Sequence, residues 1–160
     1  MKGILLTLVI ISSYCSITLA QTEKEDVTIA QALFGKTKKE IILEYVKIPA
    51  AQQEAFWSEY DQYEIKDNEI NLARFNLIKR FAANYDTLSN DVATNIAEDY
   101  IDNSAKYFDL YKAYFPKFKK VIGPIKAAAV IQLEIYIQTA IQAHLQSQIP
   151  IIGELEKHDY

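Results

Sequence analysis

The feature that most constrains the fold of this chain is an aromatic seam in a long stretch free of glycine and proline. Residues 50–85 contain neither residue type, and large apolar side chains recur there at alternating spacings of four and three, or at sums of these spacings. The seam consists of Phe56, Tyr60, Tyr63, Ile70, Leu77 and Phe81. This heptad-like pattern predicts one long amphipathic helix whose apolar face must be covered by other helices.

Two charged residues, Asp67 and Arg74, occupy positions of this seam. A buried guanidinium is costly unless a partner compensates it. Glu134 needs a partner for the same reason, because it is the one charged residue between Ala127 and Gly153. The pattern predicts a structural ion pair between Arg74 and Glu134, with Asp67 as the competing acid. The alternative is that Arg74 reaches water along its aliphatic stem.

Cap and breaker residues divide the rest of the chain into helices. Thr37 is a candidate cap for a first helix, which ends before Pro49 because proline disfavours helical geometry in the preceding residue. Ser89 or Asn90 caps a third helix, and Gly123–Pro124 separates it from a fourth. We therefore predict an all-α bundle with four main helices, at about 38–48, 50–86, 90–122 and 124–148.

Two of these helices have special features. Pro116 lies inside the third helix and predicts a kink near it, because proline removes one helical hydrogen bond. The fourth helix is apolar around most of its circumference. That composition predicts either the centre of the bundle or a helix that also forms a dimer face.

Residues 1–20 have the pattern of a secretory signal peptide, with Lys2, a short apolar run and a small residue at Ala20. The apolar run is too short to span a bilayer, so stable membrane insertion is not expected. Cleavage near Ala20 predicts a periplasmic or secreted protein and removes Cys15, the only cysteine. The predicted mature chain has a mobile arm over 21–37, a helical domain over 38–153 and an acidic tail over 154–160.

Charge and motif content exclude several functions. Without Lys2 the chain has 16 basic and 21 acidic residues, a net charge of −5, which disfavours nucleic-acid binding. We find no nucleophile–base pattern and no phosphate-binding loop, so an enzyme is not predicted. His144 and His158 do not form a metal-ligand pattern, and neither a metal nor a cofactor is predicted.

Candidate binding residues lie on the predicted third helix. Its tyrosines share one face, which is typical of either an amphipathic groove for apolar partners or a stripe at the edge of the core. The nearby lysines either form a basic edge of that groove or complement the helix dipole. The candidate client-binding residues are Tyr107, Tyr111, Lys112, Tyr114, Phe115, Phe118 and Lys119.

Three segments together resemble a known group of proteins: Ile48–Tyr63 with its Phe-Trp-x-x-Tyr-x-x-Tyr box, Arg74–Tyr85, and Tyr114–Glu134. Over residues 38–153 the chain resembles exported helical proteins of Gram-negative bacteria and, more distantly, the Spy/CpxP family of periplasmic stress proteins. That family carries a Leu-Thr-x-x-Gln motif at helix starts. Here Ile48-Pro-Ala-Ala-Gln52 keeps the apolar residue and the glutamine but lacks the threonine.

The resemblance implies a periplasmic, chaperone-like protein that holds unfolded or envelope proteins on an amphipathic surface. It also implies a homodimer formed through long antiparallel helices. The alternative function is a metal- or ligand-responsive accessory protein of envelope stress signalling.

Overall fold

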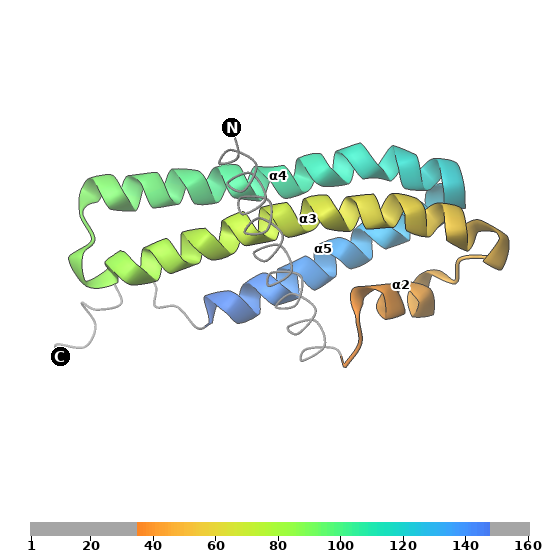
Figure 1. Cartoon of the computed structure of the whole chain (residues 1–160), viewed down its shortest axis with the longest axis horizontal. Helices are drawn as coiled ribbons and strands as arrows, with labels where there is room; N and C mark the ends of the chain where they lie inside the picture. The colour runs from red at the N-terminus through yellow and green to blue at the C-terminus, as the bar shows by residue number, and fades with distance from the viewer. Residues whose placement is uncertain (1–34, 148–160) are drawn as a thin grey trace, which may run out of the picture.

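The computed structural model describes residues 35–147 and shows an all-α bundle over that range (Figure 1). Its four α-helices are α2 (Lys38–Val46), α3 (Ala50–Asn84), α4 (Asn90–Ile122) and α5 (Pro124–Gln146), with a 3₁₀ turn, η1 (Tyr85–Thr87), after α3. The predicted fold class is therefore confirmed. The predicted signal peptide, most of the N-terminal arm and the acidic tail lie outside the described residues.

The helix boundaries follow from local chemistry. Thr37 and Glu40 form a reciprocal capping box at the start of α2, and Lys47 in the left-handed region (φ 49°) ends it. Ser89 caps α4 by accepting a hydrogen bond from the Val92 N–H at 3.3 Å. Gly123 has φ +80° and lies between α4 and α5, where an L side chain would be strained.

Three helices end about two residues earlier than the sequence predicts. Lys47 stops α2 before Ile48, the 3₁₀ turn at Tyr85 replaces the last turn predicted for α3, and α5 ends at Gln146. The helix α4 continues through Pro116 without interruption. The kink at that position stays a prediction.

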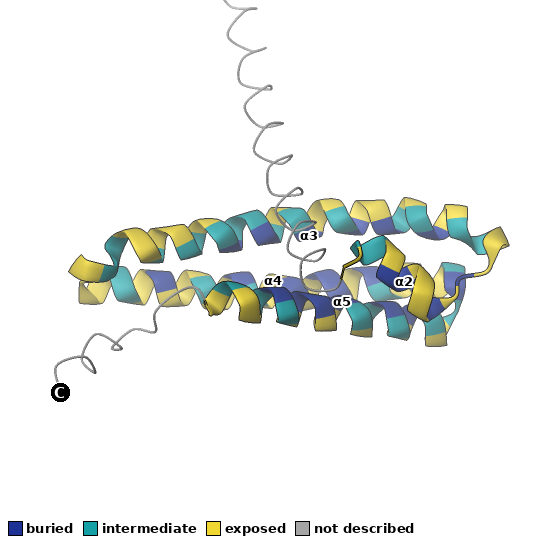
Figure 2. Cartoon of the chain, turned by 90° about the horizontal axis from the view of Figure 1, so that it is seen from below, coloured by how far each residue is buried: buried dark blue, intermediate teal, exposed yellow. Residues whose placement is uncertain are grey.

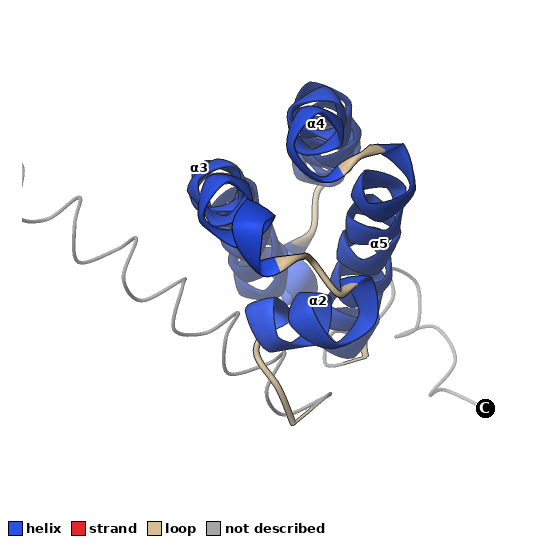
Figure 3. Cartoon of the chain, turned by 90° about the vertical axis from the view of Figure 1, so that its right-hand side faces the viewer, coloured by secondary structure: helices blue, strands red, loops and turns tan. Residues whose placement is uncertain are grey.

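The long helices α3 and α4 pack antiparallel along their lengths, and α5 packs on α4 (Figures 1 and 3). The short helix α2 contacts α5 and lies beside it at the end of the bundle where α3 begins (Figure 3). Figure 2 shows the buried residues in dark blue on the inward sides of these helices. As a result α2 occupies a fourth corner of the bundle at one end only.

An aromatic core fills the end of the bundle that α2 covers. Phe56 stacks with Tyr60 at a ring-centroid distance of 5.7 Å, and Tyr60 stacks with Tyr63 at 5.6 Å. Phe118 of α4 is fully buried and lies 5.4 Å from Phe56. The first half of the predicted seam is thus the main core, where ring contacts add to the stability gained from buried apolar area.

The helix α5 is not the centre of the bundle. It buries one face, while Ile125, Ile135 and Tyr136 are exposed on the rest of its circumference. The prediction that this helix lies at the centre of the bundle is therefore wrong. The bundle is built around the α3–α4 pair, and α5 presents apolar side chains to the outside.

Candidate functional site

The centre of the protein contains a buried carboxylate, Glu134 of α5. The Tyr60 hydroxyl donates a hydrogen bond to Glu134 Oε1 at 2.6 Å, and the Tyr63 hydroxyl donates to Oε2 at 3.1 Å. Both tyrosines come from the seam of α3. Lys38 Nζ lies 2.8 Å from the same Oε2. Two charge-assisted hydrogen bonds and an ion pair therefore compensate the burial of this group.

Lys38, the first residue of α2, joins two acids. Its ammonium also contacts Asp67 Oδ2 of α3 at 2.8 Å, and its side chain is only 14% exposed. Burial alone would lower the pKa of Lys38, but the attraction of Asp67 and Glu134 outweighs burial and raises that pKa well above its ordinary value. Lys38 thus stays charged, and it connects α2 to both α3 and α5.

The network continues along α3 through Asn71. The Asn71 side chain donates to Asp67 Oδ2 at 3.2 Å, while its own oxygen accepts from the Tyr107 hydroxyl at 2.6 Å and from Gln138 at 3.0 Å. All of these groups are buried. Each is satisfied by another member of the network, which fixes the relative register of α3, α4 and α5.

The predicted pair between Arg74 and Glu134 is wrong, although both residues are buried as predicted. Arg74 Nε donates to Asn103 at 2.7 Å, its Nη2 donates to Ser104 at 2.6 Å, and its guanidinium lies 3.5 Å from the centre of the Tyr100 ring. Glu134 pairs with Lys38 instead. Heptad spacing places a residue on a face of its helix, but it does not say which layer of a partner helix lies opposite.

Arg74 has no acidic partner within the described residues, and its Nη1 is buried without a hydrogen bond there. The face of the Tyr100 ring supplies part of the missing compensation through a cation–π contact. The alternative that Arg74 extends to water is also wrong, because the whole residue is only 3% exposed.

The aromatic residues proposed from the sequence as a client surface are mostly core. Tyr107, Tyr111, Tyr114 and Phe118 are buried, and Phe115 is half-buried. Burial raises the pKa of Tyr111, as burial together with Glu134 raises the pKa values of Tyr60 and Tyr63. Most of this stripe therefore belongs to the α3–α4 interface, although Tyr107 and Tyr111 also line a shallow depression of about 110 Å³ beside α5. Client binding by this face stays a prediction.

The two lysines proposed with these aromatics, Lys112 and Lys119, are exposed. The Lys112 ammonium lies 3.5 Å from the Asp109 carboxylate on the preceding helical turn, and the Lys119 ammonium lies 5.9 Å from the centre of the Phe115 ring. The structure thus brings the proposed residues onto one helix but separates the lysines from the buried rings.

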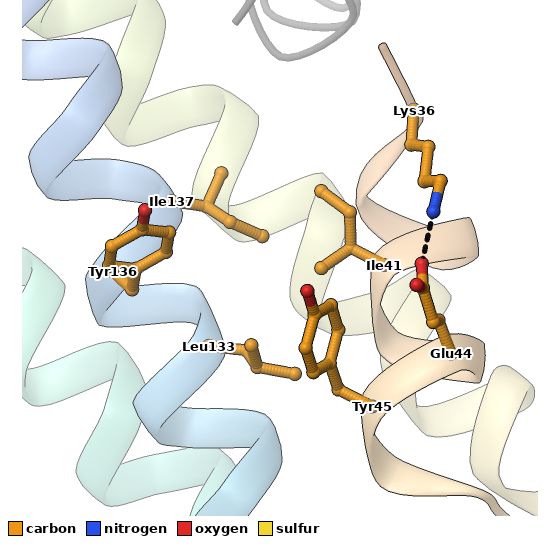
Figure 4. A pocket seen from close by; sticks show the side chains of 7 residues that line it. All are labelled: Lys36, Ile41, Glu44, Tyr45, Leu133, Tyr136 and Ile137. Atoms are coloured by element: carbon orange, nitrogen blue, oxygen red, sulfur yellow. Dashed lines mark hydrogen bonds and ion pairs between the residues drawn. The ribbon is translucent and has the colours of Figure 1, made fainter. Parts of the chain in front are cut away.

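An apolar groove lies where the sequence did not predict one, between α2 and α5 (Figure 4). It has a volume of about 320 Å³ and is lined by Lys36, Ile41, Glu44, Tyr45, Leu133, Tyr136 and Ile137. Tyr45 and Tyr136 are 68% and 61% exposed. An ion pair between Lys36 and Glu44 forms one rim (Figure 4). The exposed, apolar character of this groove makes it a candidate binding surface.

Two packing contacts position the wall that α2 contributes. Ile41 packs with Ile137 and Ile141 of α5 in a small second core, and Ile42 is fully buried in the main core. Lys38 lies three and four residues before these isoleucines, so it shares their buried face. This spacing is the sequence signal that could have identified Lys38 as a partner of the buried acids.

The described residues contain no group of three or more histidine, cysteine or acidic side chains that could hold a metal ion. His144 is exposed in the last turn of α5. His158 and the acidic tail lie outside the described residues. Between residues 35 and 147, no helix is both long and apolar enough to cross a membrane.

Comparison with protein-family models, with curated proteins and with solved structures returns no match.

Proposed function

We propose that this chain is an exported, non-enzymatic binding protein that holds apolar segments of unfolded or envelope proteins in the groove between α2 and α5. The observation that carries the proposal is the groove itself, an open apolar depression with two highly exposed tyrosines on its walls. Tyrosine supplies a large contact area with few rotatable bonds, which suits contact with varied apolar side chains.

The groove is suited to a polypeptide rather than to a reaction. Its charged lining residues, Lys36 and Glu44, pair with one another at the rim, and its apolar lining includes Ile41, Leu133 and Ile137. The buried polar groups of the protein satisfy one another in the network around Glu134. They act as scaffold, and the apolar lining is what contacts the client.

This proposal keeps the chaperone-like role that the resemblance to the Spy/CpxP family implies, but it places the contact surface elsewhere. The client surface moves from the tyrosine face of α4, which is buried, to the outward faces of α2 and α5. The expectation of a periplasmic or secreted location belongs to the same proposal, because an exported holding protein meets unfolded envelope proteins there.

The test is suppression of aggregation of reduced lysozyme, followed by light scattering at near-stoichiometric ratios. The wild-type chain should suppress scattering, and Tyr45→Asp with Tyr136→Asp should abolish most of the effect. The matched control is Ile65→Asp, which changes an exposed apolar residue of α3 that does not line the groove.

Equal suppression by the double variant and the wild type would contradict the assignment of the groove. Absence of suppression by the wild type would contradict the proposed function. Repeating the assay with zinc tests the metal-responsive alternative, which requires activity to depend on the added metal.

A further inference from the structure

The end of the bundle where α4 meets α5 carries an excess of positive charge. Residues 110–133 contain five lysines and no acid, although the whole chain has a net charge of −4. At the other end of α4, residues 81–105 contain five acids and neither lysine nor arginine, and one of these acids, Asp99, pairs with Arg80. The 33 residues of α4 extend about 50 Å from the acidic end to the basic end. Charge is therefore separated along the length of the bundle.

Four lysines and one isoleucine form the surface of this end, which we call the basic tip. Each of them is one or two positions from a residue of the main core, and those core residues pack together. The loop between α2 and α3 and the turn between α4 and α5 therefore lie at the same end of the bundle (Figure 3). The basic tip consists of Lys47, Lys119, Lys120, Ile125 and Lys126.

The lysines of the basic tip form no ion pair within residues 35–147. The lysines of α4 outside the tip do: Lys112 contacts Asp109 at 3.5 Å. In the same way Lys117 contacts Glu59 of α3 at 3.6 Å. Glu54, near the start of α3, has no ion pair in this range either, and it offsets one charge of the tip at most. The basic tip therefore keeps a net positive charge that faces solvent.

Helix stability does not account for this composition. Cations in the last turn of α4 complement its dipole, which explains Lys119 and Lys120. Lys126, however, lies in the first turn of α5, where the dipole disfavours a cation and no acid is present. Ile125 precedes it and, at 85% exposed, is the most exposed large apolar side chain of residues 35–147. A misplaced cation next to a fully presented apolar side chain indicates a partner that is both anionic and apolar.

We propose that the basic tip docks peripherally on an anionic phospholipid bilayer. The lysines contact headgroup phosphates, and Ile125 enters the boundary between headgroups and acyl chains, as the apolar side chains of surface-bound helices do. Each lysine close to such a surface strengthens binding about fivefold. The same surface repels the acidic end of α4, so the bundle stands with its long axis away from the membrane.

The shape of the basic tip favours a bilayer over an acidic polypeptide. No residue of the tip lines the groove between α2 and α5 or the depression between α4 and α5. The lysines surround a projecting side chain, which suits a surface that has an apolar layer beneath its charges. Docking through the tip also leaves the groove between α2 and α5 open, so this proposal is independent of the function proposed for that groove.

Co-sedimentation with vesicles tests the proposal on the protein in the form that cells export. The vesicles consist of phosphatidylcholine with or without phosphatidylglycerol. The wild-type chain should bind only the vesicles that contain phosphatidylglycerol, and added salt should weaken this binding. Replacing three lysines of the tip together, Lys119→Gln, Lys120→Gln and Lys126→Gln, should weaken it about a hundredfold.

The matched control removes the same amount of charge elsewhere. Lys66, Lys79 and Lys106 are exposed on α3 and α4 outside the basic tip. The triple replacement of these lysines by glutamine should stay within about twofold of the wild type, because charges far from the surface are screened. A tip variant that binds as tightly as this control would overturn the proposal, as would a wild-type chain that does not sediment with phosphatidylglycerol vesicles.

The apolar contact has its own test. Ile125→Ser should weaken binding to phosphatidylglycerol vesicles about tenfold, because less apolar area leaves water on docking. Ile65→Ser is the control, since Ile65 is an exposed isoleucine of α3 outside the tip, and it should bind like the wild type. Binding that is unchanged by Ile125→Ser and is competed by soluble polyglutamate would assign the tip to an acidic polypeptide and overturn docking on a membrane.

Discussion

Lys38 offers the sharpest test of how the buried network holds the bundle together. Its ammonium lies 2.8 Å from one carboxylate oxygen of Asp67 and 2.8 Å from one of Glu134, and the side chains of these acids are 3% and 2% exposed. Lys38→Met keeps most of the aliphatic volume but removes the cation. Two buried carboxylates would then remain without a positive partner.

The expected cost is large for a single substitution. Removing one partner of a buried ion pair typically destabilises a protein by about 3–5 kcal/mol, because the remaining charge is uncompensated. The Lys38 side chain is 14% exposed, so water relieves part of this penalty and we expect the lower end, about 3 kcal/mol. This loss of stability corresponds to an increase of about a hundredfold in the unfolding equilibrium constant and a decrease of about 10 °C in the melting temperature.

The chain supplies a matched control on the same helix. Lys39 also contacts two carboxylates of α3, Asp61 at 2.7 Å and Glu64 at 3.3 Å, but its side chain is 44% exposed. Exposed pairs contribute at most about 1 kcal/mol, so Lys39→Met should change stability by no more than that. Urea unfolding followed by circular dichroism measures both variants against the wild-type chain.

The pH dependence provides a second check. The pKa of Lys38 is raised in the folded state, so its stabilising contribution is complete below its unfolded pKa near 10.5 and is lost only as the pH rises through the higher folded value. Between pH 5 and 9 that contribution is therefore constant. Equal, small losses for Lys38→Met and Lys39→Met would refute this reasoning.

Three further predictions follow from the same contacts. The pKa values of Tyr60 and Tyr63 are raised by burial and by nearby carboxylates. The stability that these two groups contribute is therefore present below pH 10 and is lost as the pH rises above it. Absorbance at 295 nm should show both tyrosines ionising only together with alkaline unfolding. Arg74→Met should lower the free energy of unfolding by less than about 1.5 kcal/mol, because it removes a buried cation that lacks an acidic partner. A double-mutant cycle of Arg74→Met with Glu134→Gln should give a coupling energy near zero. Phe56→Ala should cost about 3–5 kcal/mol in urea unfolding, whereas Phe108→Ala should have little effect on stability.

The sequence predicted the helices well because their signals are local. The capping box at Thr37, the cap at Ser89 and the break at Gly123 each depend on residues within four positions of one another. The seam residues Phe56, Tyr60 and Tyr63 are fully buried as their spacing predicts. The sequence did not predict the early ends of α2 and α3, because the left-handed conformation of Lys47 and the 3₁₀ turn at Tyr85 have no distinctive local composition.

The partners of the buried charges could not be predicted in the same way. Glu134 faces Tyr60, Tyr63 and Lys38, which are 74, 71 and 96 positions away in the sequence. Heptad spacing identified Arg74 as buried, and the apolar composition around Glu134 identified that residue as buried. Neither pattern carried information about the axial offset between α3 and α5. Lys38 was overlooked because lysine at the start of a helix is usually solvated.

The burial of the face that the sequence proposed for binding has a related reason. An aromatic stripe such as that of Tyr107 and Tyr111 has the same spacing whether it lies in a core or lines a groove. The composition of α5 was the better signal. A helix apolar on most of its circumference buries one face in the bundle and leaves Ile135 and Tyr136 at the surface.

The network and the groove are linked through α2. This nine-residue helix is too short to be stable by itself, so its position depends on the contacts of one face. That face carries Lys38, Ile41 and Ile42, while Tyr45 projects into the groove. When α2 docks, it therefore supplies both the cation that compensates Asp67 and Glu134 and one wall of the groove. The groove between α2 and α5 cannot keep its shape unless the buried charges are compensated. This dependence gives a physical reason for a buried polar network in a protein whose groove is apolar.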